Sequence, residues 1–117
     1  MRRLPADARI YLISDLHLGD GTRSDAFLGK DRELIAFFEK VRKEKAHLVI
    51  VGDAIDFHQA WAISRVLRAH ARLFGELSRL AARAESASEG EEPLRVIYIW
   101  GNHDYDISLF KDLFRLE

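Results

Sequence analysis

Three pairs of polar side chains in this sequence have the types and spacing of metal ligands. They are Asp15 with His17, Asp53 with Asp56, and Asn102 with His103. The chain contains no cysteine, so a metal site would have to use oxygen and imidazole ligands. Two divalent ions held about 3.5–4 Å apart repel each other, need a carboxylate between them, and can together promote an in-line phosphoryl displacement.

Each pair, taken singly, also has an ordinary structural explanation. The first pair can be a turn residue followed by a surface histidine. Asp53 and Asp56 can be N-caps of a following helix, for which aspartate is among the preferred residues. Asn102 can be a turn residue in a left-handed conformation. The metal-site hypothesis therefore depends on whether the fold brings the three pairs together.

Apolar runs rich in strand-forming residues precede all three pairs and predict three strands. These strands are expected over Arg9–Ser14, His47–Val51 and Arg95–Trp100. The second run ends at Gly52, directly before Asp53, and has the composition of a strand buried on both faces. Open α/β sheets bind ligands outside the carboxyl ends of their strands, which is where each polar pair falls.

The stretches between the strands have helical periodicity. One helix is predicted over about Arg32–Glu44 with Asp31 as its N-cap, and a longer one over about Gln59–Ala81, in which Gly75 weakens the middle. Asp106 can cap a last helix. The order βαβαβα predicts an α/β fold with a parallel sheet and right-handed crossovers, so the three pairs should meet at one sheet edge.

Composition places few limits on the partners of the protein. The 117 residues suit one domain or part of one, and the formal net charge of -1 gives no strong signal for nucleic acid. The apolar run Ile10–Ile13 is too short for a signal peptide or a transmembrane segment. We therefore predict a cytoplasmic protein. The loop from Gly19 to Lys30, which contains Phe27, is long enough to contribute substrate contacts.

The three motifs together resemble the first three motifs of the calcineurin-like metallophosphoesterases. They read Asp15-x-His17, Gly52-Asp53-x-x-Asp56 and Gly101-Asn102-His103-Asp104, in this order. The resemblance spans residues 15–104 and implies the N-terminal half of the family's αββα sandwich.

The resemblance also implies a role for each residue. Asp15 and His17 would bind a first divalent ion, Asp53 would bridge two ions, and Asn102 would bind the second. His103 would lie at the scissile phosphate, oriented by Asp56. Manganese is the expected metal, with iron, zinc, cobalt or nickel as alternatives.

The sequence departs from the family pattern at its C-terminal side. Members usually carry two more histidine motifs and a second sheet there. The five histidines of this chain do not form those motifs, and the sequence that would form the second sheet is not among these residues. Residues 1–117 are therefore expected to be only the N-terminal part of a metallophosphoesterase domain. Of the remaining histidines, His70 falls within the apolar stripe of the long helix and is expected to be a core residue.

The expected activity is hydrolysis of a phosphomonoester, phosphodiester or pyrophosphate in a phosphorylated small-molecule or nucleotide-type substrate. Ser14–Gly19 and Trp61 are similar to the branch that includes UDP-2,3-diacylglucosamine pyrophosphohydrolases, which typically has arginine at the position of His103. The alternative is a non-catalytic scaffold on the same fold. If the chain is the whole molecule, the uncovered sheet face also predicts self-association into a homo-oligomer.

Overall fold

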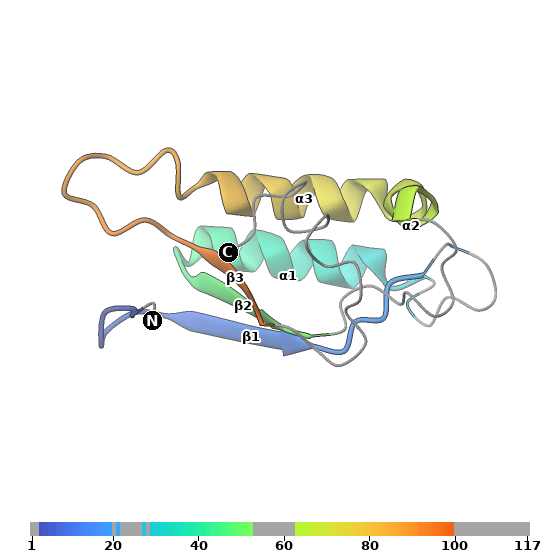
Figure 1. Cartoon of the computed structure of the whole chain (residues 1–117), viewed down its shortest axis with the longest axis horizontal. Coiled ribbons are helices and arrows are strands. Elements are labelled where there is room, and N and C mark those ends of the chain that lie inside the picture. The colour runs from blue at the N-terminus through green and yellow to red at the C-terminus, as the bar shows by residue number, and fades with distance from the viewer. Residues whose placement is uncertain (1–2, 20, 22–26, 28, 53–62, 100–117) are drawn as a thin grey trace.

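The computed structural model describes residues 3–19, 21, 27, 29–52 and 63–99. Their helices and strands are β1 (Ile10–Ser14), α1 (Asp31–Lys43), β2 (His47–Val51), α2 (Ile63–Ala69), α3 (Ala71–Ala82) and β3 (Val96–Ile99). The strands form one sheet, and α1 and α3 lie side by side against it (Figure 1). The predicted α/β fold with a parallel sheet and helices is confirmed.

The register of the sheet brings its strand ends to the same level. The strand order is β1-β2-β3, and both pairings are parallel. Ser14, the last residue of β1, pairs with Val51, the last residue of β2, and Val51 pairs with Ile99, the last residue of β3. The segments that follow the three strands therefore leave the sheet along one edge.

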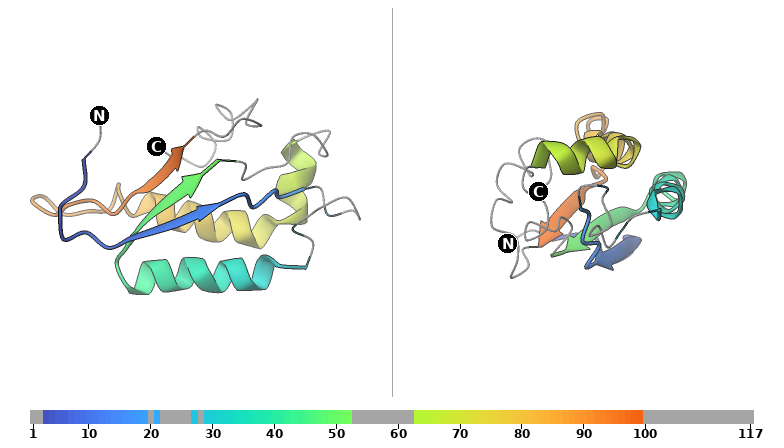
Figure 2. Two further views of the ribbon diagram at one scale, coloured as in Figure 1. Left: turned by 90° about the horizontal axis from the view of Figure 1, so that it is seen from below. Right: turned by 90° about the vertical axis from the view of Figure 1, so that its right-hand side faces the viewer.

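The core lies between the helices and one face of the sheet, and both helices cover that same face (Figure 2). The helices bury apolar residues at the three- and four-residue spacing of an amphipathic helix. These are Leu34, Phe38 and Val41 of α1 and Leu73, Phe74, Leu77 and Leu80 of α3. The strands contribute Leu48, Ile50, Val96 and Tyr98 to the same cluster. This core fixes the sheet that presents the strand ends.

The opposite face of the sheet is apolar and largely exposed in the described structure. Ile10 is 40% exposed, Leu12 66%, Val51 37% and Ile99 49%. The central strand β2 is buried from His47 to Ile50, as predicted. The edge strand β1 differs from β2: its alternate residues are exposed, because helices cover only one face of the sheet and these residues point away from them.

Two details of the helices differ from the sequence prediction. Lys30, not Asp31, occupies the N-cap position of α1, and the Asp31 carboxylate instead lies 2.6 Å from Nδ1 of His70. The expected long helix is two helices, α2 and α3, and the break falls at His70 rather than at Gly75. His70 has non-helical φ and ψ of -123° and 36° and is only 2% exposed, which confirms it as a core histidine.

Candidate metal centre at the carboxyl edge of the sheet

Backbone hydrogen bonds join the three strand ends one residue beyond the ladder of the sheet. The N–H of Asp15 donates to the carbonyl of Gly52 over 3.4 Å, and the N–H of Gly52 donates to the carbonyl of Ile99 over 2.7 Å. Gly52 has a left-handed φ of 64°, which glycine adopts without steric cost. Parallel topology thus brings the starts of two predicted motifs and the end of β3 together, as the sequence led us to expect.

Asp15 and His17 adopt an unexpected backbone conformation. Their φ values are 54° and 50°, in the left-handed region, so the segment is not extended at either residue. Between and after them, Leu16 packs against the core and Leu18 is 1% exposed. Left-handed non-glycine residues cost roughly 1–3 kcal/mol each and are concentrated at functional sites.

The two side chains nevertheless lie close together. Asp15 Oδ1 and His17 Nε2 are 3.8 Å apart, with 66% and 36% of the respective side chains exposed. Metal–ligand distances of about 2.0–2.2 Å place two donors of one ion roughly 3–3.4 Å apart. The observed separation therefore fits a chelating pair after a shift of under ~1 Å, and oxygen plus imidazole is a suitable donor set for divalent transition metals.

The remaining predicted ligands, Asp53 and Asn102, and the predicted catalytic residues, Asp56 and His103, lie outside the described residues, so their roles stay predictions. Among the residues that are described, no three His, Asp or Glu side chains form a group able to hold a metal ion. The described part of the site is therefore the Asp15–His17 pair.

An apolar hollow of about 470 Å³ lies between β1 and α1. Its lining consists of Ile13, Leu16, Phe27, Lys30, Glu33, Leu34 and Phe37. Ile13 and Leu16 belong to the same stretch of chain as Asp15, but neither Asp15 nor His17 lines the hollow. Its one signal in the sequence is the aromatic Phe27 within the polar loop that follows the first motif.

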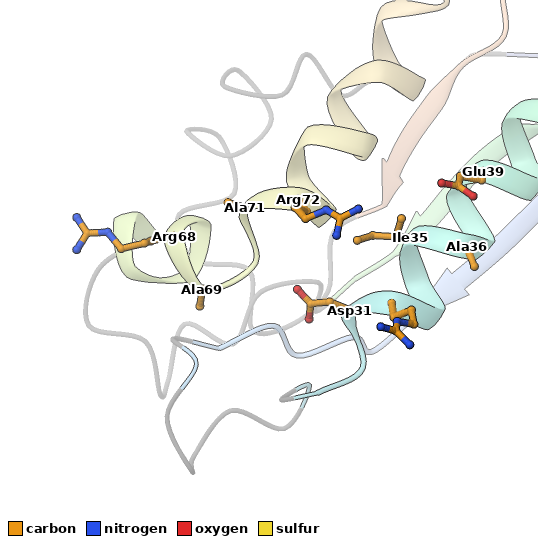
Figure 3. A pocket seen from close by; sticks show the side chains of 9 residues that line it. Asp31, Ile35, Ala36, Glu39, Arg68, Ala69, Ala71 and Arg72 are labelled. Atoms are coloured by element: carbon orange, nitrogen blue, oxygen red, sulfur yellow. The ribbon is translucent and has the colours of Figure 1, made fainter.

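A second hollow, of about 590 Å³, lies between α1 and the junction of α2 with α3. It is lined by Asp31, Arg32, Ile35, Ala36, Glu39, Arg68, Ala69, Ala71 and Arg72. Arg72 extends toward Ile35 of α1, whereas Arg68 points away from α1 (Figure 3). The arginines of the α2–α3 junction therefore do not converge on one point within this hollow.

Comparison with known proteins agrees with this geometry. The model of the calcineurin-like phosphoesterase family matches residues 8–116. A UDP-2,3-diacylglucosamine hydrolase of Porphyromonas gingivalis (strain ATCC BAA-308 / W83) is 29% identical over 99 residues, which are 83% of this chain and 33% of the relative. The chain thus spans about a third of that relative's length. No solved structure matches.

No helix in the described ranges is both long and apolar enough to cross a membrane. The match to the family model covers nearly the whole chain, and it includes the three strands whose carboxyl ends meet at Asp15, Gly52 and Ile99. The chain therefore belongs to the calcineurin-like phosphoesterase family.

Proposed function

We propose that this chain forms part of a metal-dependent phosphoesterase that hydrolyses a phosphomonoester, phosphodiester or pyrophosphate. The observation that carries the proposal is the convergence of the strand ends, with Asp15 Oδ1 and His17 Nε2 3.8 Å apart beside them. Membership of the phosphoesterase family supports the same class of reaction.

The residues of the first motif suit the first of two divalent ions, and Mn²⁺ is our preferred metal. Asp15 offers one carboxylate oxygen and His17 offers Nε2, both accessible from solvent. When bound, the two ions would supply an activated water and neutralise phosphate charge. In this proposal Asp53 bridges the two positions, and the uncharged amide of Asn102 binds the second ion without adding negative charge.

His103 and Asp56 have the proton-handling roles in this proposal. A histidine beside a carboxylate can be protonated near neutral pH and donate its proton to the leaving oxygen. Asp56 would orient the imidazole of His103 for this donation. General acid catalysis of this kind contributes about 10²- to 10⁴-fold to a rate.

The proposed substrate is a phosphorylated small molecule, such as a nucleotide-type diphosphate, with an apolar part. The name of the Porphyromonas gingivalis relative refers to UDP-2,3-diacylglucosamine, which has both a uridine diphosphate and a diacyl sugar. The apolar hollow between β1 and α1, about 470 Å³ in volume and lined in part by Ile13 and Leu16, supports the apolar part of the proposal. Cytoplasmic location stays a prediction from the sequence.

The test uses the whole parent protein, because this chain spans about a third of its relative. Metal content and hydrolysis of bis(p-nitrophenyl) phosphate with added Mn²⁺ would be measured together. We expect bound metal and turnover in the wild type, and loss of turnover in Asp53→Asn. A protein that binds metal but has no turnover with any phosphoester would instead support the non-catalytic scaffold. Unchanged turnover in Asp53→Asn would refute the proposed bridging role.

We also propose that the exposed sheet face is covered by a second copy when this chain is isolated. Ile10, Leu12, Val51 and Ile99 make that face apolar, and uncovered apolar faces of this kind promote association. Light scattering that gives the mass of a monomer at all concentrations would contradict this part of the proposal.

A further inference from the structure

The chain that leaves His17 packs against the junction between α2 and α3. Gly21 has a φ of 85°, and a Cβ added there would lie 3.0 Å from Cβ of Ala69, so the backbone approaches α2 closely. Further along, the ring of Phe27 meets the ring of His70 edge to face, with centroids 6.2 Å apart. The segment after the first motif thus contacts the junction at two described points.

The imidazole of His70 also contacts the start of α1. Its Nδ1 lies 2.6 Å and 2.8 Å from the two carboxylate oxygens of Asp31, the first residue of that helix. A carboxylate accepts hydrogen bonds, so Nδ1 carries the proton and donates it. The His70 N–H donates to the carbonyl of Val66, and its carbonyl accepts from the N–H of Phe74, which joins α2 to α3.

A polar residue in this position requires an explanation, because burying one is unfavourable unless it is hydrogen-bonded. His70 is 2% exposed and occupies a position in the apolar stripe of the sequence. Its single side chain instead links Phe27, Asp31 and the corner between two helices.

These contacts bear on the strained conformation of the first motif. The left-handed φ values of Asp15 and His17 persist only if the surrounding structure enforces them. The described packing downstream consists of buried Leu18 and Gly19, then the contact of Gly21 with Ala69, then that of Phe27 with His70. Of these contacts, the last is the one that His70 itself makes.

We propose that His70 is a positioning residue of the phosphoesterase site, which holds the segment after His17 so that Asp15 and His17 keep a metal-binding geometry. This inference rests on the proposed function. It assigns to His70 no contact with the substrate or with the metal. It predicts an effect on metal affinity and kcat that a loss of stability alone would not produce.

The experiment compares three variants of the whole parent protein with the wild type. In His70→Ala both the Asp31 and the Phe27 contacts are lost, whereas His70→Asn keeps a side-chain N–H near the position of Nδ1 for Asp31. Leu77→Ala removes a buried core side chain of α3 that makes neither contact, and serves as the stability control. Mn²⁺ affinity, kcat and KM are measured well below the melting temperature of each variant, together with amide hydrogen exchange in the metal-free protein.

We expect His70→Ala to weaken Mn²⁺ binding and lower kcat by roughly tenfold each, as for residues that orient metal ligands through contacts. KM for a small substrate should stay within twofold, and amides of residues 15–19 should exchange faster. His70→Asn should recover part of the affinity, and Leu77→Ala should melt earlier with unchanged affinity.

Wild-type affinity in folded His70→Ala, or an equal loss of affinity in Leu77→Ala, would overturn the positioning role alone. A wild type that binds no Mn²⁺ and has no turnover would overturn the proposed function, and this inference with it.

Discussion

Replacing Gly52 with alanine tests the geometry that aligns the three strand ends. Gly52 receives a hydrogen bond from Asp15 and donates one to Ile99, and its φ is 64°. An L-residue in the left-handed region costs about 1–2 kcal/mol. Against this, alanine restricts the unfolded chain and returns about 0.4–1 kcal/mol. The expected net loss in the free energy of unfolding is therefore about 1 kcal/mol, before any clash of the new methyl group in this buried position.

Gly75→Ala is the matched control. Gly75 lies inside α3, and an added Cβ would meet no heavy atom within 4 Å. Alanine in a helix is favoured over glycine by roughly 0.5–1 kcal/mol, so this variant should be more stable than the wild type. Both substitutions restrict the unfolded chain equally, so the difference between the two variants isolates the left-handed φ, at about 1–2 kcal/mol.

The measurement is urea denaturation followed by far-ultraviolet circular dichroism, supported by melting temperatures. The melting temperature of a small domain shifts by about 4–8 °C for each kcal/mol of change in the free energy of unfolding. Mn²⁺-dependent hydrolysis should fall in Gly52→Ala and stay unchanged in Gly75→Ala, because only Gly52 contacts the strand ends. If Gly52→Ala were as stable as Gly75→Ala, then the left-handed turn would be absent and the hydrogen bonds through Gly52 could not align the strands as described.

Three further predictions concern other parts of the molecule. Asp15→Asn should abolish metal-dependent turnover and change stability by under ~0.5 kcal/mol, since asparagine tolerates a left-handed φ. The control Asp7→Asn, at an exposed position, should change neither turnover nor stability. A stable, active Asp15→Asn would exclude Asp15 as a ligand. The pKa of His47 is lowered below 6.5, mainly by burial and then by the charge of Arg83, so the folded state favours the neutral ring. This contribution to stability is present above pH 6.5 and is lost as the pH falls from 6.5 through the folded-state pKa. The backbone N–H of Arg95 donates to His47 Nδ1 over 3.1 Å, and His47→Asn keeps an acceptor for this N–H. The urea midpoint of this variant should change less with pH around 6.5 than that of the wild type. An unchanged pH dependence would show that other groups cause it. Leu12→Lys, on the exposed sheet face, should reduce self-association measured by light scattering at nearly constant stability, and persistent oligomers would place the contact elsewhere.

The strands and their order could be predicted because each depends on a local pattern. The run His47–Val51 follows the turn at Glu44 and Lys45 and ends before Gly52, and the observed β2 has the predicted limits. Helix α1 begins and ends one residue before the predicted limits. Parallel pairing followed from the helical crossovers alone. These features need no knowledge of distant contacts.

The errors arose where a distant residue determines the local conformation. Asp31 is a good N-cap by type, yet its carboxylate bonds to His70, 39 positions away, and that contact accompanies the helix break. Asp15 and His17 adopt left-handed φ values, which the types of these residues and their neighbours in the sequence do not reveal. Motif spacing identified candidate ligands, but the arrangement of Asp53, Asp56, Asn102 and His103 stays a prediction.

The central place of β2 in the sheet has a consequence for the order in which the protein opens. In the described sheet β2 pairs on both sides, whereas β1 pairs only with β2 and exposes alternate side chains. Edge strands with few buried side chains open at lower free energy than the global unfolding reaction. Deuterium should therefore enter β1 before β2, and a bound ion at Asp15 and His17 should slow that entry. Metal binding would then be visible as slower deuterium entry into an edge strand of the described sheet.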